Sequence, residues 1–78
     1  MTDHRRPVKR SLTLLGHRTS VSLEDIFWEA FRREAASEGK TINGLAAEID
    51  KTRGDIGLAS AIRVYVFEKA LSRGQSLE

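Results

Sequence analysis

"GHRTSVSLEDIFWEAF", residues 16–31, changes its apolar period halfway along. Up to Val21, polar and apolar side chains alternate, as they do in a strand with one buried face. From Leu23 onward, the apolar residues recur every three or four positions, which is the period of an amphipathic helix. The stretch therefore predicts a largely polar strand that passes directly into a helix.

The preceding segment "KRSLTLL", residues 9–15, also alternates and places Leu12 and Leu14 on one face. If the strand ran straight through Gly16, Arg18 would join that apolar face. Because glycine permits a bulge, bend or break that exchanges the faces, we predict one N-terminal strand with such an irregularity. Its inward side chains are then Thr19 and Val21, and its outward ones are Arg18, Ser20 and Ser22. In the other register, the outward set is His17, Thr19 and Val21.

The first helix is marked at both ends. Ser22, followed three residues later by Asp25, predicts an N-cap and a helix that begins at Leu23. Gly39 predicts the stop, so that the helix runs to about Ser37. The apolar stripe of this helix consists of Leu23, Ile26, Phe27, Ala30, Phe31 and Ala35.

Two further helices are predicted after this one. A short helix follows Thr41, whose hydroxyl suits an N-cap, and ends near Asp50. Its apolar stripe consists of Ile42, Leu45, Ala46 and Ile49. The last segment, "LASAIRVYVFEKALSR" at residues 58–73, contains β-branched residues that suit a strand, but its alanine, glutamate and lysine residues favour a helix. This helix is apolar around most of its circumference.

A chain of 78 residues buries only a modest core by itself. Since a helix that is apolar on most sides needs to be enclosed, we predict a mainly α-helical intertwined homodimer with an extra C-terminal helix. The predicted shared core consists of Val21, Leu23, Phe27, Phe31, Leu45, Ile49, Ile62, Tyr65 and Val66. The predicted divisions are a flexible basic arm at residues 1–8, the domain at residues 9–76, and tag-derived residues at 77–78.

Basic charge is concentrated near the N-terminus. Residues 1–18 carry five basic side chains and one acidic one, whereas the remainder carries eight basic and ten acidic ones. The five basic residues are Arg5, Arg6, Lys9, Arg10 and Arg18. Such a basic end indicates a polyanionic partner, or else a solvated tail.

Other classes of function find little support. The chain has two histidines, no cysteine and no phosphate-binding glycine loop, so we predict no enzyme, no cofactor and no metal site. No apolar run is long enough to span a bilayer, and no helix has the basic polar face of a surface anchor, so we predict no membrane partner. The absence of cysteine suits a reducing compartment, and we expect the protein in the cytoplasm.

Two polar strands, one from each subunit, would pair into an antiparallel ribbon that is narrow enough for the major groove of DNA. Arg18 can donate bidentately to guanine, and the hydroxyl groups of Ser20 and Ser22 can contact several bases. We therefore predict double-stranded DNA as the partner and these three residues as base contacts. The alternative is a solvent-facing edge strand.

Four stretches together resemble a known family: "RTSVSLE" at 18–24, "FW" at 27–28, "EGKTINGL" at 38–45 and "LASAIRVYVFE" at 58–68. In combination they are similar to ribbon-helix-helix domains, in particular to short bacterial members with an Arc-like or MetJ-like fold. The resemblance covers about residues 9–72. It implies a homodimeric DNA-binding regulator of transcription whose paired strands read the major groove.

The resemblance also implies phosphate contacts through backbone N–H groups at the N-terminus of the second helix. In this chain those positions are Thr41, Ile42 and Asn43, with Lys40 beside them. Lys9 and Arg10 are further phosphate-contacting candidates from the basic end. Simpler members of the family have one longer helix where this chain has two. An alternative use of the fold is a protein-interaction module or an antitoxin, with a protein partner and weak or no DNA reading.

Overall fold

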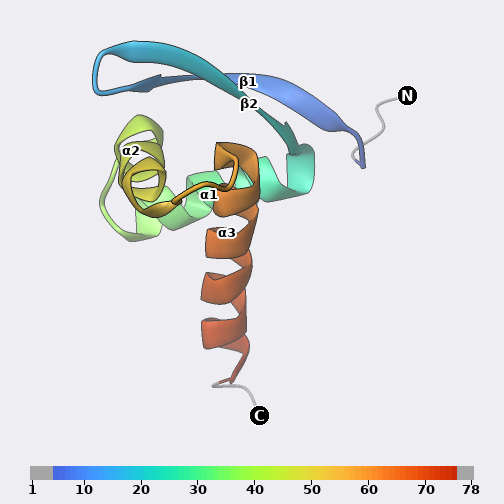
Figure 1. The fold of residues 1–78 in the computed structure, drawn as a ribbon. Coiled ribbons are helices and arrows are strands. Elements are labelled where there is room, and N and C mark those ends of the chain that lie inside the picture. The colour runs from blue at the N-terminus through green and yellow to red at the C-terminus, as the bar shows by residue number, and fades with distance from the viewer. Residues whose placement is uncertain (1–4, 76–78) are drawn as a thin grey trace.

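The computed structural model of the chain describes residues 5–75. They form two strands, β1 (Pro7–Leu14) and β2 (His17–Glu24), followed by three helices, α1 (Asp25–Ser37), α2 (Ile42–Thr52) and α3 (Leu58–Gln75). The strands lie across one end of the molecule, and α3 runs away from them (Figure 1). Residues 1–4 of the predicted arm and the predicted tag residues 77–78 lie outside the described range.

The sequence predicts one N-terminal strand, whereas the structure has two that pair antiparallel as a hairpin. Leu15 and Gly16 form the turn between them, with φ values of 51° and 86°. Two positive φ values are typical of a type I′ turn, whose twist matches that of paired strands. The irregularity at Gly16 is therefore a reversal of the chain, and β2 has a partner strand within its own chain. Because β1 begins at Pro7, the last two residues of the predicted arm belong to the hairpin.

The two faces of the hairpin differ as the alternation predicts. Leu12, Val21 and Leu23 are buried, whereas Arg18 and Ser20 are exposed on the opposite face. The predicted exchange of faces at the turn glycine is thus confirmed. The alternative register is wrong, because it would turn Val21 outward, and that side chain is only 5% exposed.

α1 begins two residues later than predicted. Ser22 remains in β2, where it pairs with Lys9 of β1, and this extended conformation prevents the helix from starting at Leu23. The N-cap position falls on Glu24, whose side chain makes no capping hydrogen bond. Ser22 therefore caps no helix, and its hydroxyl lies on the outward face of the hairpin.

The turn from α1 to α2 follows the sequence closely. α1 ends at Ser37 as predicted, and Gly39 adopts a φ of 69° just beyond it. Thr41 is the N-cap of α2, and its Oγ1 accepts a hydrogen bond from the Gly44 N–H at 2.9 Å. α2 continues to Thr52, slightly beyond its predicted end.

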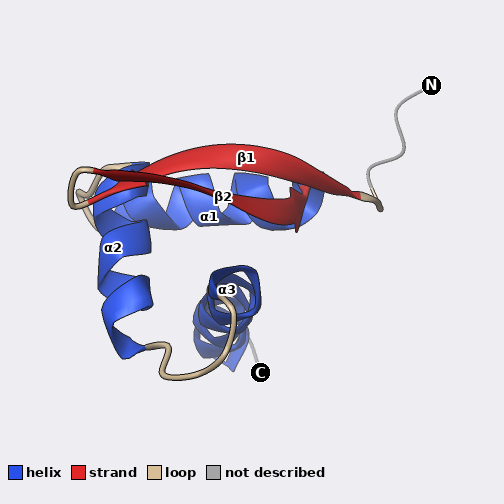
Figure 2. Ribbon diagram, turned by 45° about the horizontal axis from the view of Figure 1, so that its top comes forward, coloured by secondary structure: helices blue, strands red, loops and turns tan. Residues whose placement is uncertain are grey.

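All three helices lie on one side of the hairpin (Figure 2) and close a core with its inner face. Of the residues predicted for a shared core, the buried ones are Val21, Leu23, Phe31, Leu45, Ile49, Ile62 and Val66, and the half-buried ones are Phe27 and Tyr65. Within the chain they pack together in one core. The sequence predicts Ile26 on the apolar stripe of α1, but this side chain is 72% exposed. Five residues turn a helix by about 140°, so Ile26 points away from the side that buries Phe31.

Candidate nucleic-acid interface

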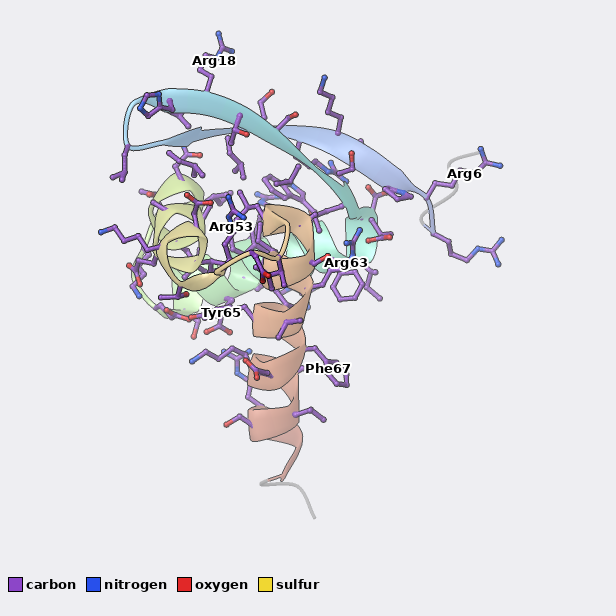
Figure 3. All side chains as sticks on the ribbon, in the orientation of Figure 1. Arg6, Arg18, Arg53, Arg63, Tyr65 and Phe67 are labelled. Atoms are coloured by element: carbon purple, nitrogen blue, oxygen red, sulfur yellow. The ribbon has the colours of Figure 1, made fainter. Side chains whose placement is uncertain are left out.

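Six polar side chains form the outward surface of the hairpin, called here the polar hairpin face. They are Lys9, Ser11 and Thr13 of β1, and Arg18, Ser20 and Ser22 of β2. The strand register pairs them directly across the hairpin, and all six are exposed. Arg18 points away from the helices (Figure 3). The face thus combines two cationic groups with four hydroxyl groups and contains no carboxylate.

The sequence identifies the β2 half of this face and misses Ser11 and Thr13. Both residues alternate with Leu12 and Leu14, so their outward direction is present in the pattern. Their place beside the β2 residues depends on the pairing of β1 with β2. The alternation of polar and apolar residues within one segment does not predict which strands pair. Once the turn at Leu15 is known, the cross-strand partners follow directly.

Arg10 is placed differently from the phosphate contact expected of it. It lies on the inner face, half-buried, where it forms an ion pair with Asp25 and stacks 5.4 Å from the ring centroid of Trp28. Its guanidinium therefore holds β1 to the first turns of α1. Of the two candidates in β1, Lys9 is the one on the outward face.

The N-terminus of α2 lies against the edge of β1. The side-chain oxygen of Asn43 accepts a hydrogen bond from the Thr13 N–H at 3.0 Å. Thr41 caps the helix through its side chain, and the backbone N–H groups of Ile42 and Asn43 have no acceptor within residues 5–75. Because a helix N-terminus carries partial positive charge, these donors suit an anion next to the hairpin.

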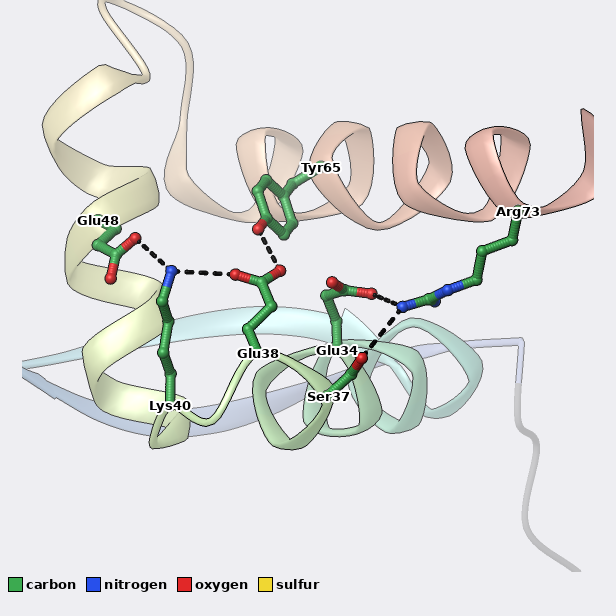
Figure 4. A network of polar contacts seen from close by, with 7 residues as sticks. All are labelled: Glu34, Ser37, Glu38, Lys40, Glu48, Tyr65 and Arg73. Carbon is green, nitrogen blue, oxygen red and sulfur yellow. Dashed lines mark hydrogen bonds and ion pairs between the residues drawn. The ribbon is translucent and has the colours of Figure 1, made fainter.

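Lys40 precedes this helix end, but its ammonium group is held by two carboxylates (Figure 4). It donates to Glu48 at 2.8 Å and to Glu38 at 3.0 Å. These contacts, with Glu48 the stronger, raise the pKa of Lys40. Its charge is therefore largely balanced inside the chain, although the residue has the position expected from the sequence.

Glu38 is the centre of the polar network in Figure 4. It also accepts a hydrogen bond from the Tyr65 hydroxyl. Hydrogen bonds with Glu34, and then with Tyr65 and Lys40, lower the pKa of Glu38 to about 2. Burial, and then the contact with Glu38, raise the pKa of Tyr65 to about 12. Arg73 donates to the buried Glu34 at 2.7 Å, so the network fastens α3 to α1 along much of its length.

Arg63 connects α3 to the end of β2. It donates to both carboxylate oxygens of Glu24, at 3.0 and 3.2 Å, and to the backbone carbonyl of Ser22 at 3.2 Å. The bond from Arg63 is the main cause that lowers the pKa of Glu24. The same guanidinium lies 5.8 Å from the ring centroid of Phe27. α3 is therefore fixed on the β2 side of the hairpin.

Residues 5–75 were also searched for helices that could span a membrane and for groups of side chains that could bind a metal ion. None of the helices in this range is long and apolar enough to cross a membrane. The same range places no three histidine, aspartate or glutamate side chains together in a way that could hold a metal ion. His17, at the start of β2, is exposed.

Comparison with known families agrees with this architecture. The sequence model of the ribbon-helix-helix domain family matches residues 7–70. In general, this family consists of DNA-binding regulators. This range includes the hairpin, α1, α2 and most of α3. No curated protein and no solved structure gives a significant match. The match covers well over half of the chain and confirms the resemblance found in its sequence. The chain therefore belongs to the ribbon-helix-helix domain family.

Proposed function

We propose that this protein is a sequence-specific DNA-binding regulator of transcription that reads the major groove with its polar hairpin face. The observation that carries the proposal is the exposure of six hydrogen-bonding side chains, none of them acidic, on one side of a two-stranded ribbon. Two strands about 4.8 Å apart fit a groove about 12 Å wide, and in the homodimer proposed below these would be the two central β2 strands, one from each copy. Membership of a family of DNA-binding regulators supports the same class of function.

The side chains of this face have distinct recognition chemistry. Arg18 donates bidentately to the two major-groove acceptors of guanine. Ser20 and Ser22 contact bases through hydroxyl groups that both donate and accept. Ser11 and Thr13, paired across the ribbon with Ser20 and Arg18, add hydroxyl groups from β1.

Phosphate contacts are proposed for groups beside the ribbon. Lys9 is exposed at the start of the polar hairpin face, and its ammonium group suits a phosphate oxygen. The N–H groups of Ile42 and Asn43, with Thr41 as the cap, are proposed to hold a second phosphate. The hydrogen bond from Thr13 to Asn43 fixes the distance between this helix end and the ribbon.

A homodimer joined through β2 is also proposed. Strand backbone groups alternate in direction, and the Ser22 carbonyl, which accepts from Arg63, faces away from β1. By this alternation, the backbone groups of Arg18 and Ser20 also face away from β1, and they have no partner within residues 5–75. An antiparallel ribbon between two β2 strands, centred on Ser20, would use them.

The opposite edge of the hairpin is less suited to a second copy. Pro7 has no backbone N–H to donate at the beginning of β1. Near the other end of this strand, the Thr13 N–H is bonded to Asn43. The Thr13 bond does not distinguish the two edges, because the Ser22 carbonyl on β2 is likewise bonded, to Arg63. The missing N–H of Pro7 protects the β1 edge from pairing, which favours β2 as the joining strand.

Selection of bound duplexes from a random pool, followed by titration of the preferred duplex, tests the function. Arg18→Ala is expected to weaken binding to the preferred duplex by about 10-fold to 100-fold, and binding to random duplex by much less. The control is Lys51→Ala, which removes an equal charge from the exposed last turn of α2, at the opposite end of that helix from Thr41. Equally weak binding to every duplex, unchanged by Arg18→Ala, would reject sequence reading and favour a protein-interaction module.

A further inference from the structure

β1 becomes the outermost strand of the sheet when two β2 strands pair as proposed above. The sheet then has four strands, with the two β2 strands at its centre and one β1 strand on each side. At a spacing of about 4.8 Å between neighbouring strands, the two β1 strands lie about 14 Å apart. A major groove about 12 Å wide therefore admits the central β2 pair but not all four strands.

We infer that β1 contacts the sugar–phosphate backbone at the edge of the groove, through the outward side chains of Lys9, Ser11 and Thr13. These three side chains are called here the β1 row. The inference rests on the proposed function and divides its polar hairpin face into two halves. The β2 half reads bases, whereas the β1 half holds phosphates and positions β2. It adds Ser11 and Thr13 to the phosphate contact already proposed for Lys9.

The chemistry of the β1 row suits phosphate. Its side chains end in one ammonium group and two hydroxyl groups, which all donate hydrogen bonds to phosphate oxygens. None of them has the paired groups with which an arginine, asparagine or glutamine side chain identifies a base. Arg18, which does have such paired donors, lies on β2. In addition, the β1 sequence contains no carboxylate that would repel a phosphate.

The position of α2 gives independent support. α2 packs against β1, and Asn43 in its first turn accepts a hydrogen bond from the Thr13 N–H at 3.0 Å. Because this N–H is bonded to α2, it points away from β2, and the N-terminus of α2 lies beside the outer edge of β1. A phosphate held by this helix end is therefore next to the β1 row, on the side away from β2. A DNA strand that passes one of them also passes the other.

β1 is fixed in this position before any DNA is bound. Leu12, which lies between Ser11 and Thr13 in sequence, is only 3% exposed and anchors the strand in the core. Arg10 ties the same strand to α1 through its ion pair with Asp25. Since the backbone is already ordered, little conformational entropy is lost when the β1 row meets a phosphate backbone.

The base preference of a variant without the two hydroxyl groups tests the division of the face. We expect the double variant Ser11→Ala/Thr13→Val to select the same preferred duplex as the wild type from a random pool. It should bind preferred and random duplexes more weakly, by about 10-fold in both cases. The control is Ser72→Ala, which removes a hydroxyl group from an exposed position in the last turns of α3 and should change neither property. Circular dichroism checks that the variants remain folded.

Neutral phosphates test the contact itself. A methylphosphonate placed at a single position of the preferred duplex removes the charge of one phosphate and leaves the base sequence intact. We expect the wild type to lose affinity for duplexes modified at the edges of the groove. Ser11→Ala/Thr13→Val should lose much less at these positions, because its contact is already absent, whereas Arg18→Ala should lose as much as the wild type.

The outcomes separate this inference from the proposed function. A change in the preferred sequence of Ser11→Ala/Thr13→Val would mean that β1 reads bases, and unchanged affinity would mean that β1 does not touch DNA. Equal sensitivity of this variant and the wild type to every methylphosphonate would mean that its hydroxyl groups hold no phosphate. Each of these results would overturn the inference and leave sequence-specific binding through Arg18 in place. A wild-type protein that binds no duplex at all would reject the proposed function, and the inference with it.

Discussion

The two arginines of the hairpin show how strand parity decides the use of a charge. Arg10 has the parity of Leu12 and Leu14, and it lies inward, paired with Asp25. Arg18 has the same parity in the sequence, but the turn at Leu15 and Gly16 exchanges the two faces, so Arg18 is exposed. The direction of both side chains could be predicted from the alternation. The pairing of Arg10 could not, because its partner lies 15 residues away and meets it only after the chain has reversed.

Glu38 provides a prediction for stability at acid pH. Its folded-state pKa of about 2 lies below the ordinary value of 4.5. The contribution of its carboxylate to stability is therefore fully present above about pH 4.5 and is lost as the pH falls toward 2. Glu38→Gln should remove this part of the pH dependence, so that its free energy of unfolding falls less than that of the wild type across this window. Urea denaturation at a series of pH values measures the difference.

The control for this prediction is Glu29→Gln. Glu29 is an exposed residue of α1 whose partner, Arg32, lies on the same helix. This variant should keep the acid dependence of the wild-type protein. If the curves for Glu38→Gln and the wild type run parallel from pH 4.5 to 2, the network around Glu38 does not stabilise the fold through its charge.

At the scale of elements, the helices were more predictable than the hairpin. The end of α1, the Thr41 cap of α2 and the helical nature of α3 are local features of sequence, and all three are confirmed. The hairpin depends on contacts between strands and on a turn that contains leucine at a positive φ. Leucine is not a residue that signals such a turn, so the sequence suggested an irregular single strand.

Leu15 is accordingly a site where the hairpin can be stabilised. Its φ of 51° is unfavourable for a leucine, and its side chain is 74% exposed, so it gains little from burial. Leu15→Asn introduces a residue that tolerates this backbone conformation. It should raise the free energy of unfolding by about 1 kcal/mol. Urea denaturation measures this change. Leu15→Val, which is β-branched, should lower the stability, and an equal effect of both variants would argue against strain at this position.

At the scale of the whole molecule, the chain is divided by charge and by polarity. The polar hairpin face carries two cations and no carboxylate, whereas α3 exposes the apolar side chains of Val64, Phe67 and Leu71. The core between them is formed by residues of the hairpin and of all three helices. The sequence predicts that α3 is apolar around most of its circumference, but composition does not tell which of its apolar side chains remain exposed, and these are Val64, Phe67 and Leu71.

This division predicts how DNA binding responds to salt. Each phosphate contact releases counterions and contributes about 0.9 to the slope of log K against log salt concentration. Lys9 is exposed at the hairpin end and is proposed to contact one phosphate in each copy. Lys9→Ala in a homodimer should therefore reduce the slope by about 2 and weaken preferred and random duplexes alike. Titrations over a range of salt concentrations measure the slope. Lys51→Ala should leave it unchanged, and a Lys9→Ala protein with the wild-type slope but an altered preferred sequence would mean that Lys9 reads a base.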